Sequence, residues 1–352
     1  MTKTSKPVID LQAFLKGPAQ GDVNSSVTSS ATATLLFDLR SELGEGIVYD
    51  DITDQIVWTD ILGRRFHRLT LHTAELETME LPKMLGSFAL LSSGKSSYEG
   101  GYLFAWEDGF QLYNPSLQKA LSPMSHGEPV NPDKLPTRLN DGRCDPLGRR
   151  YICGGFYGGK DEFRMKVFSC HWNTRKDPTE GEPTTLVHEP LLLDPVRVTN
   201  SLQFSPDGKT MYFADSPTQQ IFKYDYHAEA ATTAELLSNK QLVYQVEMEH
   251  AVPDGSCVDA EGFLWNATWW NGVQGSRVRR IDPSTGKVVF EVHMPDETSQ
   301  VSCCCFGGEQ KDILFITTAG EKRDRNKEPH AGGLYAIKLT GVKGRLEARF
   351  QC

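Results

Sequence analysis

The segment Asn200–Tyr226, NSLQFSPDGKTMYFADSPTQQIFKYDY, decides the fold of this chain. It opens with a short alternating run, and a Ser-Pro-Asp-Gly turn follows at 205–208. An aromatic-rich run at 211–214 and a second alternating run at 220–226 come next. Alternation with a period of two, interrupted by turns rich in Gly, Asp and Pro, is typical of short β-strands. The segment therefore predicts a succession of strands.

The same outline recurs along the chain, and the recurring units start roughly 40–60 residues apart, the spacing of propeller blades. The starts are Gly44, Gly86, Asn140, Asn200, Asp254 and Ser302. Six units of about four strands each predict an all-β protein, a six-bladed β-propeller. Helical periodicity is confined to a short possible helix near Val8–Leu15. A pair of β-sandwiches is the alternative, but it gives no reason for a polar residue at the head of each unit.

Four units carry an oxygen-bearing side chain just before or at the start of a strand, namely Glu45, Asn140, Asn200 and Asp254. If the units surround an axis, these side chains converge in the central channel. Carboxylate and amide oxygens bind hard cations. Two carboxylates and an amide leave coordination positions open for water and substrate, which suits catalysis. The alternative is that such Asx-Gly pairs only form turns, which explains Asp207–Gly208 well.

Composition excludes several functions. The 352 residues are 39% hydrophobic and 10% aromatic, which is ample for a packed core. With 37 basic against 46 acidic residues, the chain lacks the basic face that a nucleic-acid partner would need. No apolar stretch approaches the ~20 residues needed to span a bilayer, and the N-terminus lacks the apolar core of a signal peptide. We therefore expect a cytoplasmic protein with no membrane or nucleic-acid partner.

Three further features bear on organisation. None of the eight cysteines forms a CxxC pair, so a structural zinc site is not supported, and Cys303–Cys305 are predicted to be core residues rather than a metal or redox site. Residues 1–34 are predicted to be a loosely attached N-terminal extension, and residues 35–352 the propeller, a single catalytic domain. The Pro-, Glu- and Thr-rich stretch Thr174–Pro190 is predicted to be a loop between blades.

Six motifs then occur in the order found in one family: Gly44–Gly46 followed by Tyr49, Arg138–Arg149, Asn200–Gly208, Pro253–Gly262, Ser302–Gly308 and Ala331–Tyr335. From about Leu36 to Lys343 the chain resembles the senescence-marker protein (regucalcin), gluconolactonase and luciferin-regenerating enzyme family. The resemblance implies a six-bladed propeller with one divalent metal in the channel. It also implies hydrolysis of sugar lactones, which many members catalyse.

By this resemblance, Glu45, Asn200 and Asp254 fall on the metal-ligand positions of the family. Arg138 and Asn140 fall on its substrate-contact positions, and Asp254 also matches the general base. The identity of the metal stays open, because this set of oxygens suits Ca, Zn, Mg, Mn or Fe.

The chain departs from the family after the Asn-Asp-Gly strand, where some members carry an acidic substrate contact. It has Cys153–Gly159 instead, which leaves the preferred sugar open. In this stretch Phe156 and Tyr157 either shape the substrate pocket or simply pack in the protein interior. Trp269–Asn271 either lines the mouth of the site, where a sugar ring would stack on the aromatic faces, or packs.

The predicted function is a metal-dependent hydrolase that opens a sugar aldonolactone to the aldonic acid, with metal-activated water and Asp254 as general base. The expected partner is a small-molecule sugar lactone, while its ring size and the oligomeric state stay open. The chain lacks the G-x-S-x-G elbow of a serine nucleophile. The alternatives are a calcium-binding or scaffold propeller without catalysis, and a promiscuous esterase or organophosphate hydrolase using the same site.

Overall fold

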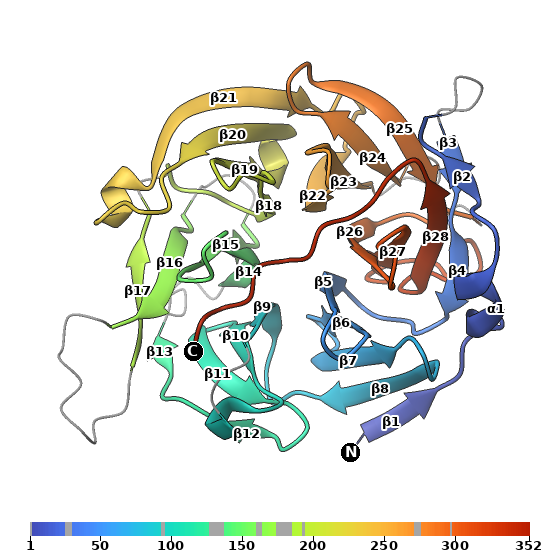
Figure 1. The fold of residues 1–352 in the computed structure, drawn as a ribbon, viewed down its shortest axis with the longest axis horizontal. Helices are drawn as coiled ribbons and strands as arrows, with labels where there is room; N and C mark the ends of the chain where they lie inside the picture. The colour runs from blue at the N-terminus through green and yellow to red at the C-terminus, as the bar shows by residue number, and fades with distance from the viewer. Residues whose placement is uncertain are drawn as a thin grey trace.

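Six sheets surround a central axis and form a six-bladed β-propeller, as predicted (Figure 1). Their strands pair antiparallel, apart from two short strands of the N-terminal segment that add in parallel to the outer edges of two sheets. The computed structural model describes residues 2–24, 30–92, 96–126, 137–159, 164–173, 185–191, 194–270, 276–295 and 298–352. Among them no helix has both the length and the apolar character needed to cross a membrane.

Blades 1 to 3 follow one another along the chain, with the innermost strand first. Blade 1 contains β5 (Gly44–Asp50), β6 (Gln55–Asp60), β7 (Arg65–Thr70), β8 (Glu75–Glu80) and, at its outer edge, β1 (Thr2–Ser5). Blade 2 contains β9 (Leu85–Leu90), β10 (Tyr102–Trp106), β11 (Gly109–Asn114), β12 (Lys119–Ala120) and β13 (Ser125–His126). Blade 3 contains β14 (Thr137–Cys144), β15 (Tyr151–Tyr157), β16 (Val167–Trp172) and β17 (Leu186–Pro190).

Blades 4 to 6 complete the ring. Blade 4 contains β18 (Thr199–Phe204), β19 (Thr210–Asp215), β20 (Gln220–Tyr226) and β21 (Leu237–Gln245). Blade 5 contains β22 (Val252–Val258), β23 (Leu264–Trp269), β24 (Arg277–Asp282), β25 (Lys287–His293) and β3 (Ser30–Thr32). Blade 6 contains β26 (Val301–Gly307), β27 (Ile313–Thr318), β28 (Leu334–Thr340), β4 (Thr34–Phe37) and β2 (Gly21–Asp22). Among the described residues, the helices are α1 (Leu11–Lys16) and three short 3₁₀ turns, Ser96–Tyr98, Ser216–Thr218 and Thr233–Glu235.

The six predicted unit starts all fall in the innermost strands, β5, β9, β14, β18, β22 and β26, which surround the channel (Figure 1). The end of the channel where these strands begin is called the open end below. The end where they turn into the second strand of each blade is called the tail end.

Alternation along each strand explains how the blades pack. In β6, Ile56 and Trp58 face an apolar cluster shared with blade 6, whereas Val57 between them faces a cluster shared with blade 2. Each fully buried side chain of this size stabilises the fold by about 1.5–3 kcal/mol. The cysteine run follows the same rule, because Cys303 and Cys305 face blade 1 and Cys304 faces blade 5. All three are buried, which confirms the prediction that they are core residues.

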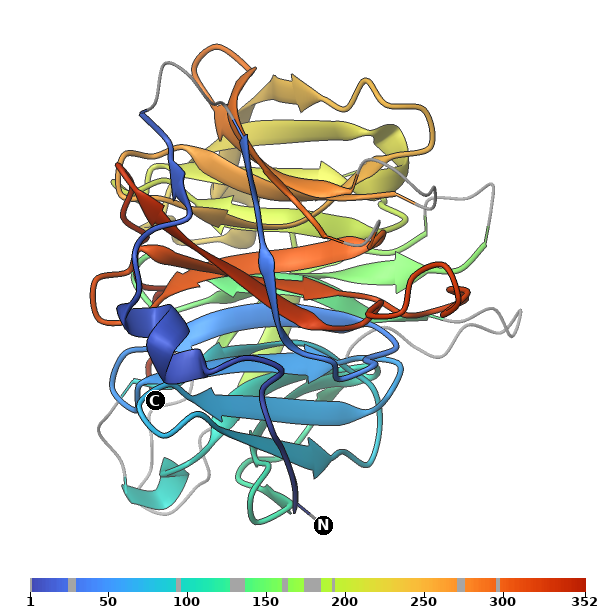
Figure 2. The same ribbon diagram turned by 90° about the vertical axis from the view of Figure 1, so that its right-hand side faces the viewer.

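The N-terminal segment is not loosely attached, contrary to our expectation. Strand β1 pairs with β8 of blade 1, β3 pairs with β25 of blade 5, and β2 and β4 pair with β28 of blade 6. Figure 2 shows this segment running along the outer edge of the blades. The outer strands β8, β25 and β28 offer unpaired backbone groups, and the segment satisfies them.

The short predicted helix is present, although it begins three residues later, as α1. Asp10 caps it by accepting a hydrogen bond from the Ala13 amide at 3.0 Å. Its one fully buried residue, Leu11, packs into the core cluster between blades 1 and 6. The helix therefore covers the join between these two blades.

The C-terminal tail, Val342–Cys352, crosses the channel at the end opposite the strand starts, as the dark red segment in Figure 1 shows. It contacts every blade on the way. The contacts join Gly344 to Lys311, Ala260 to Lys343, Arg345 to Phe204, Glu347 to Arg143, Phe350 to Leu90 and Arg349 to Asp50. The tail therefore covers this end of the channel.

The predicted inter-blade loop Thr174–Pro190 is corrected at its C-terminal end. Residues 186–190 form β17, the outer strand of blade 3, which pairs with β16 through residues such as Val187 and His188. Residues 174–184 lie outside the described residues. The Pro-rich composition argued against a strand here. Pro190 is nevertheless compatible with one, because Pro at the end of an outer strand removes no ladder hydrogen bond.

Candidate functional site

Each innermost strand is interrupted near the open end by a shift in pairing register. The shifts follow Glu45, Leu139, Asn200 and Pro253 in blades 1, 3, 4 and 5. A β-bulge of this kind leaves a residue unpaired and re-aims the neighbouring side chain. The four polar residues singled out from the sequence all lie at these bulges, inside the strands rather than before them.

Backbone conformation at two bulges is left-handed. Gly46 has φ 62° and Ser201 has φ 55°, and each directly follows a polar site residue, Glu45 or Asn200. Glycine adopts this conformation freely, whereas a serine is held in it by its surroundings. Here the Ser201 hydroxyl donates to the Asp254 carbonyl oxygen at 2.7 Å, which also links blades 4 and 5.

The remaining two blades carry the register shift without an acidic or amide side chain. In blade 2 the position falls at Gly86, where a Cβ atom would come within 2.3 Å of the Leu139 carbonyl oxygen. In blade 6 it falls at Ser302, whose hydroxyl donates to the Gly44 carbonyl oxygen. These two blades therefore contribute packing and backbone support at this level.

Amide groups link blades 3 and 4 at the site. The Asn140 side-chain amide donates to the Asn200 Oδ1 atom at 3.2 Å and to the Thr199 carbonyl oxygen at 2.7 Å. The Asn200 amide in turn donates to the Ser216 hydroxyl at 2.8 Å, and Arg138 donates to the Asn140 Oδ1 atom. These bonds leave Asn140 and Asn200 little rotational freedom.

The two carboxyl groups of the site are buried and interact with each other. Burial raises the pKa of Glu45 well above its ordinary value, and the nearby Asp254 and Asp141 raise it further, while the Gly46 amide and Arg138 lower it. Burial also raises the pKa of Asp254, with Asp141 adding to the effect and a hydrogen bond with Glu45 opposing it. Two neighbouring carboxylates that are both ionised repel each other unless a proton or a cation lies between them.

The balance of charges around the site favours binding of a divalent cation. Among the described residues, Glu45, Asp254 and Glu321 act on Arg138, and Asp141 and Glu347 act on Arg143. Carboxylates therefore outnumber guanidinium groups when all are ionised. A buried charge needs a partner, and one divalent cation among Glu45, Asp254 and Asn200 would supply it. The donor set therefore fits the predicted metal.

A group of three or more His, Cys, Asp or Glu side chains able to hold a metal is absent from the described residues. The candidate set does not conflict with this, because it contains two carboxylates and one amide, Asn200. Oxygen sets of mixed carboxylate and amide character are ordinary for hard cations.

The Arg138 guanidinium group acts on both carboxyl groups, and β15 holds it in place. The Phe156 ring lies under its guanidinium group, 4.4 Å from ring centroid to Cζ, and the two residues are register partners. Burial lowers the pKa of Arg138 to about 10, although Glu45 and Asp254 oppose this. Phe156 thus shapes the site, whereas Tyr157 is buried in the core between blades 3 and 4.

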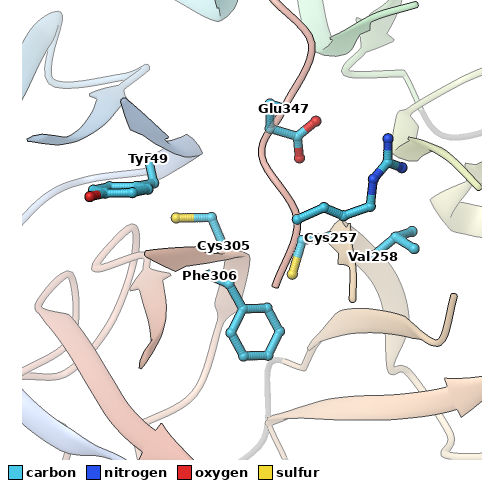
Figure 3. A pocket seen from close by; sticks show the side chains of 7 residues that line it. Tyr49, Cys257, Val258, Cys305, Phe306 and Glu347 are labelled. Carbon is cyan, nitrogen blue, oxygen red and sulfur yellow. The ribbon is translucent and has the colours of Figure 1, made fainter. Parts of the chain in front are cut away.

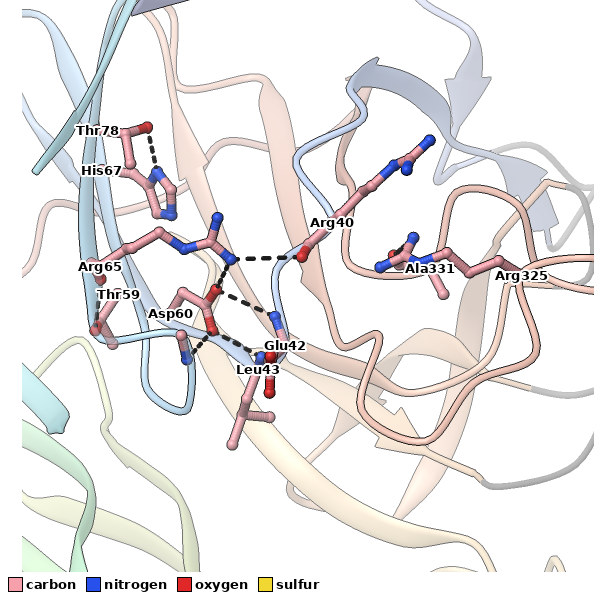
Figure 4. A network of polar contacts seen from close by, with 11 residues as sticks. Arg40, Glu42, Leu43, Thr59, Asp60, Arg65, His67, Thr78, Arg325 and Ala331 are labelled. Atoms are coloured by element: carbon pink, nitrogen blue, oxygen red, sulfur yellow. Dashed lines mark hydrogen bonds and ion pairs between the residues drawn. The ribbon is translucent and has the colours of Figure 1, made fainter. Parts of the chain in front are cut away.

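Two aspartates that sequence reasoning missed hold the loops leading into the site strands. Asp60, the last residue of β6, accepts hydrogen bonds from the Glu42 and Leu43 amides at 3.1 and 2.9 Å, and from Arg65 at 2.6 Å (Figure 4). Asp215, the last residue of β19, accepts from the Arg197 and Val198 amides at 3.0 and 2.9 Å.

These caps occupy the same place in blades 1 and 4, just before Glu45 and Asn200. The signal was present in the sequence, since both second strands end in Asp, in QIVWTD and TMYFAD. Comparing the ends of the second strands across units, and not only the starts of the first, would have found them.

The predicted aromatic group at the mouth is described in part. Trp269, at the end of β23, is half-buried and packs against an apolar cluster at the open end that contains Leu43, Ile61 and Ala319. Trp270 is also half-buried. Asn271 lies outside the described residues.

Fold and site together define a class: a six-bladed propeller whose channel holds buried carboxyl and amide oxygens beside a guanidinium group. The chain belongs to the SMP-30/gluconolactonase/LRE-like family, whose model matches residues 43–320. Regucalcin of Gallus gallus is 31% identical over 314 residues, covering 87% of this chain and 93% of the relative. A Bacillus subtilis protein provisionally named sugar lactone lactonase YvrE is 29% identical over 317 residues, covering 87% and 94%.

Solved structures of two proteins resemble this fold over most of the chain. A calcium-binding protein, regucalcin, from Agrobacterium tumefaciens superposes with a TM-score of 0.74 at 25% identity, covering 92% of this chain and 100% of that one. A luciferin-regenerating enzyme also gives a TM-score of 0.74, at 23% identity, covering 91% and 100%. The second likeness concerns the fold alone.

Proposed function

We propose that this protein is a metal-dependent lactonase that hydrolyses a sugar aldonolactone to the aldonic acid. The observation that carries the proposal is the buried pair Glu45 and Asp254, which lies beside the linked amides Asn140 and Asn200 and the guanidinium group of Arg138. Family membership and the name of the Bacillus subtilis relative support the same reaction class.

Glu45, Asn200 and Asp254 would hold one divalent cation, with calcium, zinc, magnesium, manganese and iron as candidates. When bound, such a cation supplies Lewis-acid polarisation of a carbonyl group and acidifies water. Since burial and like charge raise the pKa of both carboxyl groups in its absence, binding would release protons.

Asp254 is the proposed general base. It would accept a proton from the water that attacks the lactone carbonyl carbon, and return that proton to the ring oxygen as the bond between this carbon and the ring oxygen breaks. One carboxyl group can serve both steps, because it acts as the base when ionised and as the acid once it has taken up the proton.

Arg138 and Asn140 are the proposed substrate-contact residues. Phe156 supports one face of the Arg138 guanidinium group, and Asn140 accepts one of its hydrogen bonds. The remaining N–H groups of Arg138 would donate to sugar hydroxyls or to the oxyanion that develops on the carbonyl oxygen. Donors fixed before the substrate arrives need no reorganisation during the reaction.

Cation binding without catalysis is the second candidate, and the calcium-binding regucalcin structure favours it. A binding protein needs the ligand residues only. The buried Arg138, supported by Phe156 and bonded to Asn140, favours the enzyme. The cytoplasmic location expected from the sequence stays a prediction.

The deciding experiment is a panel of five- and six-membered aldonolactones, assayed by acid release after treatment with a chelator and readdition of each candidate metal. We expect metal-restored turnover that Asp254→Ala lacks. Asp207→Ala, in an exposed turn of blade 4, is the matched control and should keep its activity. Turnover that survives both the chelator and Asp254→Ala would exclude the proposed mechanism.

A further inference from the structure

One buried arginine lies directly below the candidate site and spans the channel. Arg143 follows Asn140 by three residues on β14, and its side chain is 5% exposed. Its Nε atom lies 3.4 Å from the Leu202 carbonyl oxygen of β18, and its Nη2 atom 3.3 Å from the Ser256 carbonyl oxygen of β22. Arg143 therefore ties together the three innermost strands that carry Asn140, Asn200 and Asp254.

The contacts are made at corresponding places in the two partner strands. Leu202 is two residues beyond Asn200, and Ser256 is two residues beyond Asp254. Gln203 adds a parallel link, because its amide donates to the same Ser256 carbonyl oxygen at 2.8 Å. The distance between β18 and β22 is thus fixed twice, just below Asn200 and Asp254, two of the three residues proposed to bind the cation.

The C-terminal tail completes this layer with Glu347. Its Oε1 atom accepts from the Gln203 amide at 3.1 Å and lies 3.6 Å from the Arg143 Nη1 atom. The carboxylate is therefore held by both residues that bridge the strands. Below, Arg349 anchors the tail separately by pairing with Asp50 and Asp51 of blade 1.

The Glu347 side chain is 19% exposed. A cavity of about 10 Å³, with room for roughly one water molecule, lies beside it (Figure 3). Its walls are Tyr49, Cys257, Val258, Cys305, Phe306, Arg345 and Glu347. The contacts with Gln203 and Arg143 therefore hold the carboxylate in place.

We propose that Arg143 and Glu347 are positioning residues for cation binding: together with Gln203 they form a floor that sets the separation of the strands carrying Asn200 and Asp254. The inference rests on the proposed metal site. Residues that orient metal ligands without touching the metal typically change metal affinity 10- to 100-fold when they are replaced.

The test compares cation affinity, measured by titration calorimetry with Ca²⁺ and separately with Zn²⁺, in four full-length proteins. They are the wild type, Glu347→Gln, Arg143→Met and the control Arg349→Gln, which removes a tail anchor without touching the floor. Urea unfolding of each metal-free variant measures stability independently of binding. We expect Glu347→Gln and Arg143→Met to weaken affinity about 10-fold or more, and Arg349→Gln to leave it within about two-fold.

Arg143→Met separates position from charge. Removing a positive charge below the site would strengthen cation binding if charge alone mattered, so weaker binding supports the floor. Binding at or above wild-type strength in Arg143→Met would overturn it, as would equal losses in Glu347→Gln and Arg349→Gln. If Arg143→Met does not fold, Gln203→Met decides, because it removes the contacts with Ser256 and Glu347 without changing the charge. If the wild type binds neither ion, the titrations are repeated with Mg²⁺, Mn²⁺ and Fe²⁺. A wild-type protein that binds none of the five would refute the proposed function, and the floor with it.

Discussion

The open end and the tail end of the channel are lined by the same six strands, but their charges are arranged differently. At the open end, Glu45 and Asp254 are buried together with one guanidinium group, that of Arg138, acting on both. At the tail end, Arg143 interacts with both Glu347 and Asp141, which raise its pKa although burial opposes them. Burial and net charge therefore do not mark the candidate site, because each end sets two carboxylates against one guanidinium group. The two ends differ in the pKa of that guanidinium group, which is raised at the tail end and lowered at the open end.

The largest effect should follow from reducing the charge at the open end. Glu45→Gln keeps the size of the side chain and its neighbours but removes one of two carboxylates, so we expect cation affinity to fall at least about 100-fold, beyond the range seen for residues outside the ligand shell. Calorimetric titration with each candidate metal measures this. An unchanged affinity would mean that the excess charge at this end has no role in cation binding.

The second prediction compares buried aspartates at the two ends. Asp60 holds the loop before Glu45, and Asp259 holds the turn after β22 by accepting from the Glu261 and Phe263 amides, both at 3.0 Å. Asn at either position loses charge-assisted hydrogen bonds, so each variant should lower the free energy of unfolding by about 1–3 kcal/mol. Only Asp60→Asn should also weaken cation binding. Equal changes in affinity in the two variants would show that the Asp60 cap has no specific role in cation binding.

The third prediction concerns pH in the absence of metal. Burial and Asp254 raise the pKa of Glu45 above its ordinary value of 4.5. Above pH 4.5 the folded state therefore keeps protons that the unfolded state has lost, and the free energy of unfolding should fall as pH rises, by at most about 1.4 kcal/mol per pH unit for one group. Urea unfolding in chelator across pH measures this slope. Glu45→Gln should flatten it, and a slope of the opposite sign would contradict the burial of these groups.

The smallest effect is expected at Phe156, which supports Arg138. Replacement by Leu removes the aromatic face but retains bulk, and a cation–π contact at a partly exposed site is worth about 0.5–1 kcal/mol. We therefore expect kcat/KM for the preferred lactone to fall about two- to five-fold with cation affinity unchanged. Tyr157→Phe, in the neighbouring core, is the control and should keep kcat/KM. If kcat/KM falls in Tyr157→Phe but not in Phe156→Leu, then Phe156 does not support the substrate contact.

The blades and the convergence of the candidate residues could be predicted from the sequence because they depend on patterns within each unit. Alternation defines the strands, and the position of Glu45 in its unit matches that of Asn200 and Asp254. The β-bulges could not be predicted in this way, because a register shift is a property of two paired strands rather than of one. Their exact form, including the left-handed Ser201, depends on contacts with the next blade.

The structure of the two ends of the chain could not be predicted from the sequence for a related reason. Strands β1, β2 and β3 are two to four residues long and carry too little alternation to be recognised. They form because β8, β25 and β28 present open edges to them. The tail likewise has no periodic pattern, and its path depends on where six separate blades place their turns. Composition suggested a loosely attached N-terminal extension, whereas its strands pair with the outer edges of three blades.

Closure of the ring has a consequence for biosynthesis. The strand that completes blade 6, β4, comes from the beginning of the chain, and it pairs with β28 through contacts such as Leu35 with Tyr335. The ribosome must therefore have released the chain as far as β28 before the ring can close. Until then β4 has no strand to pair with. Pairing between residues so distant in sequence is slow and exposes intermediates to aggregation. A newly made chain of this protein should accordingly depend on chaperones more than a protein of similar length built from local contacts.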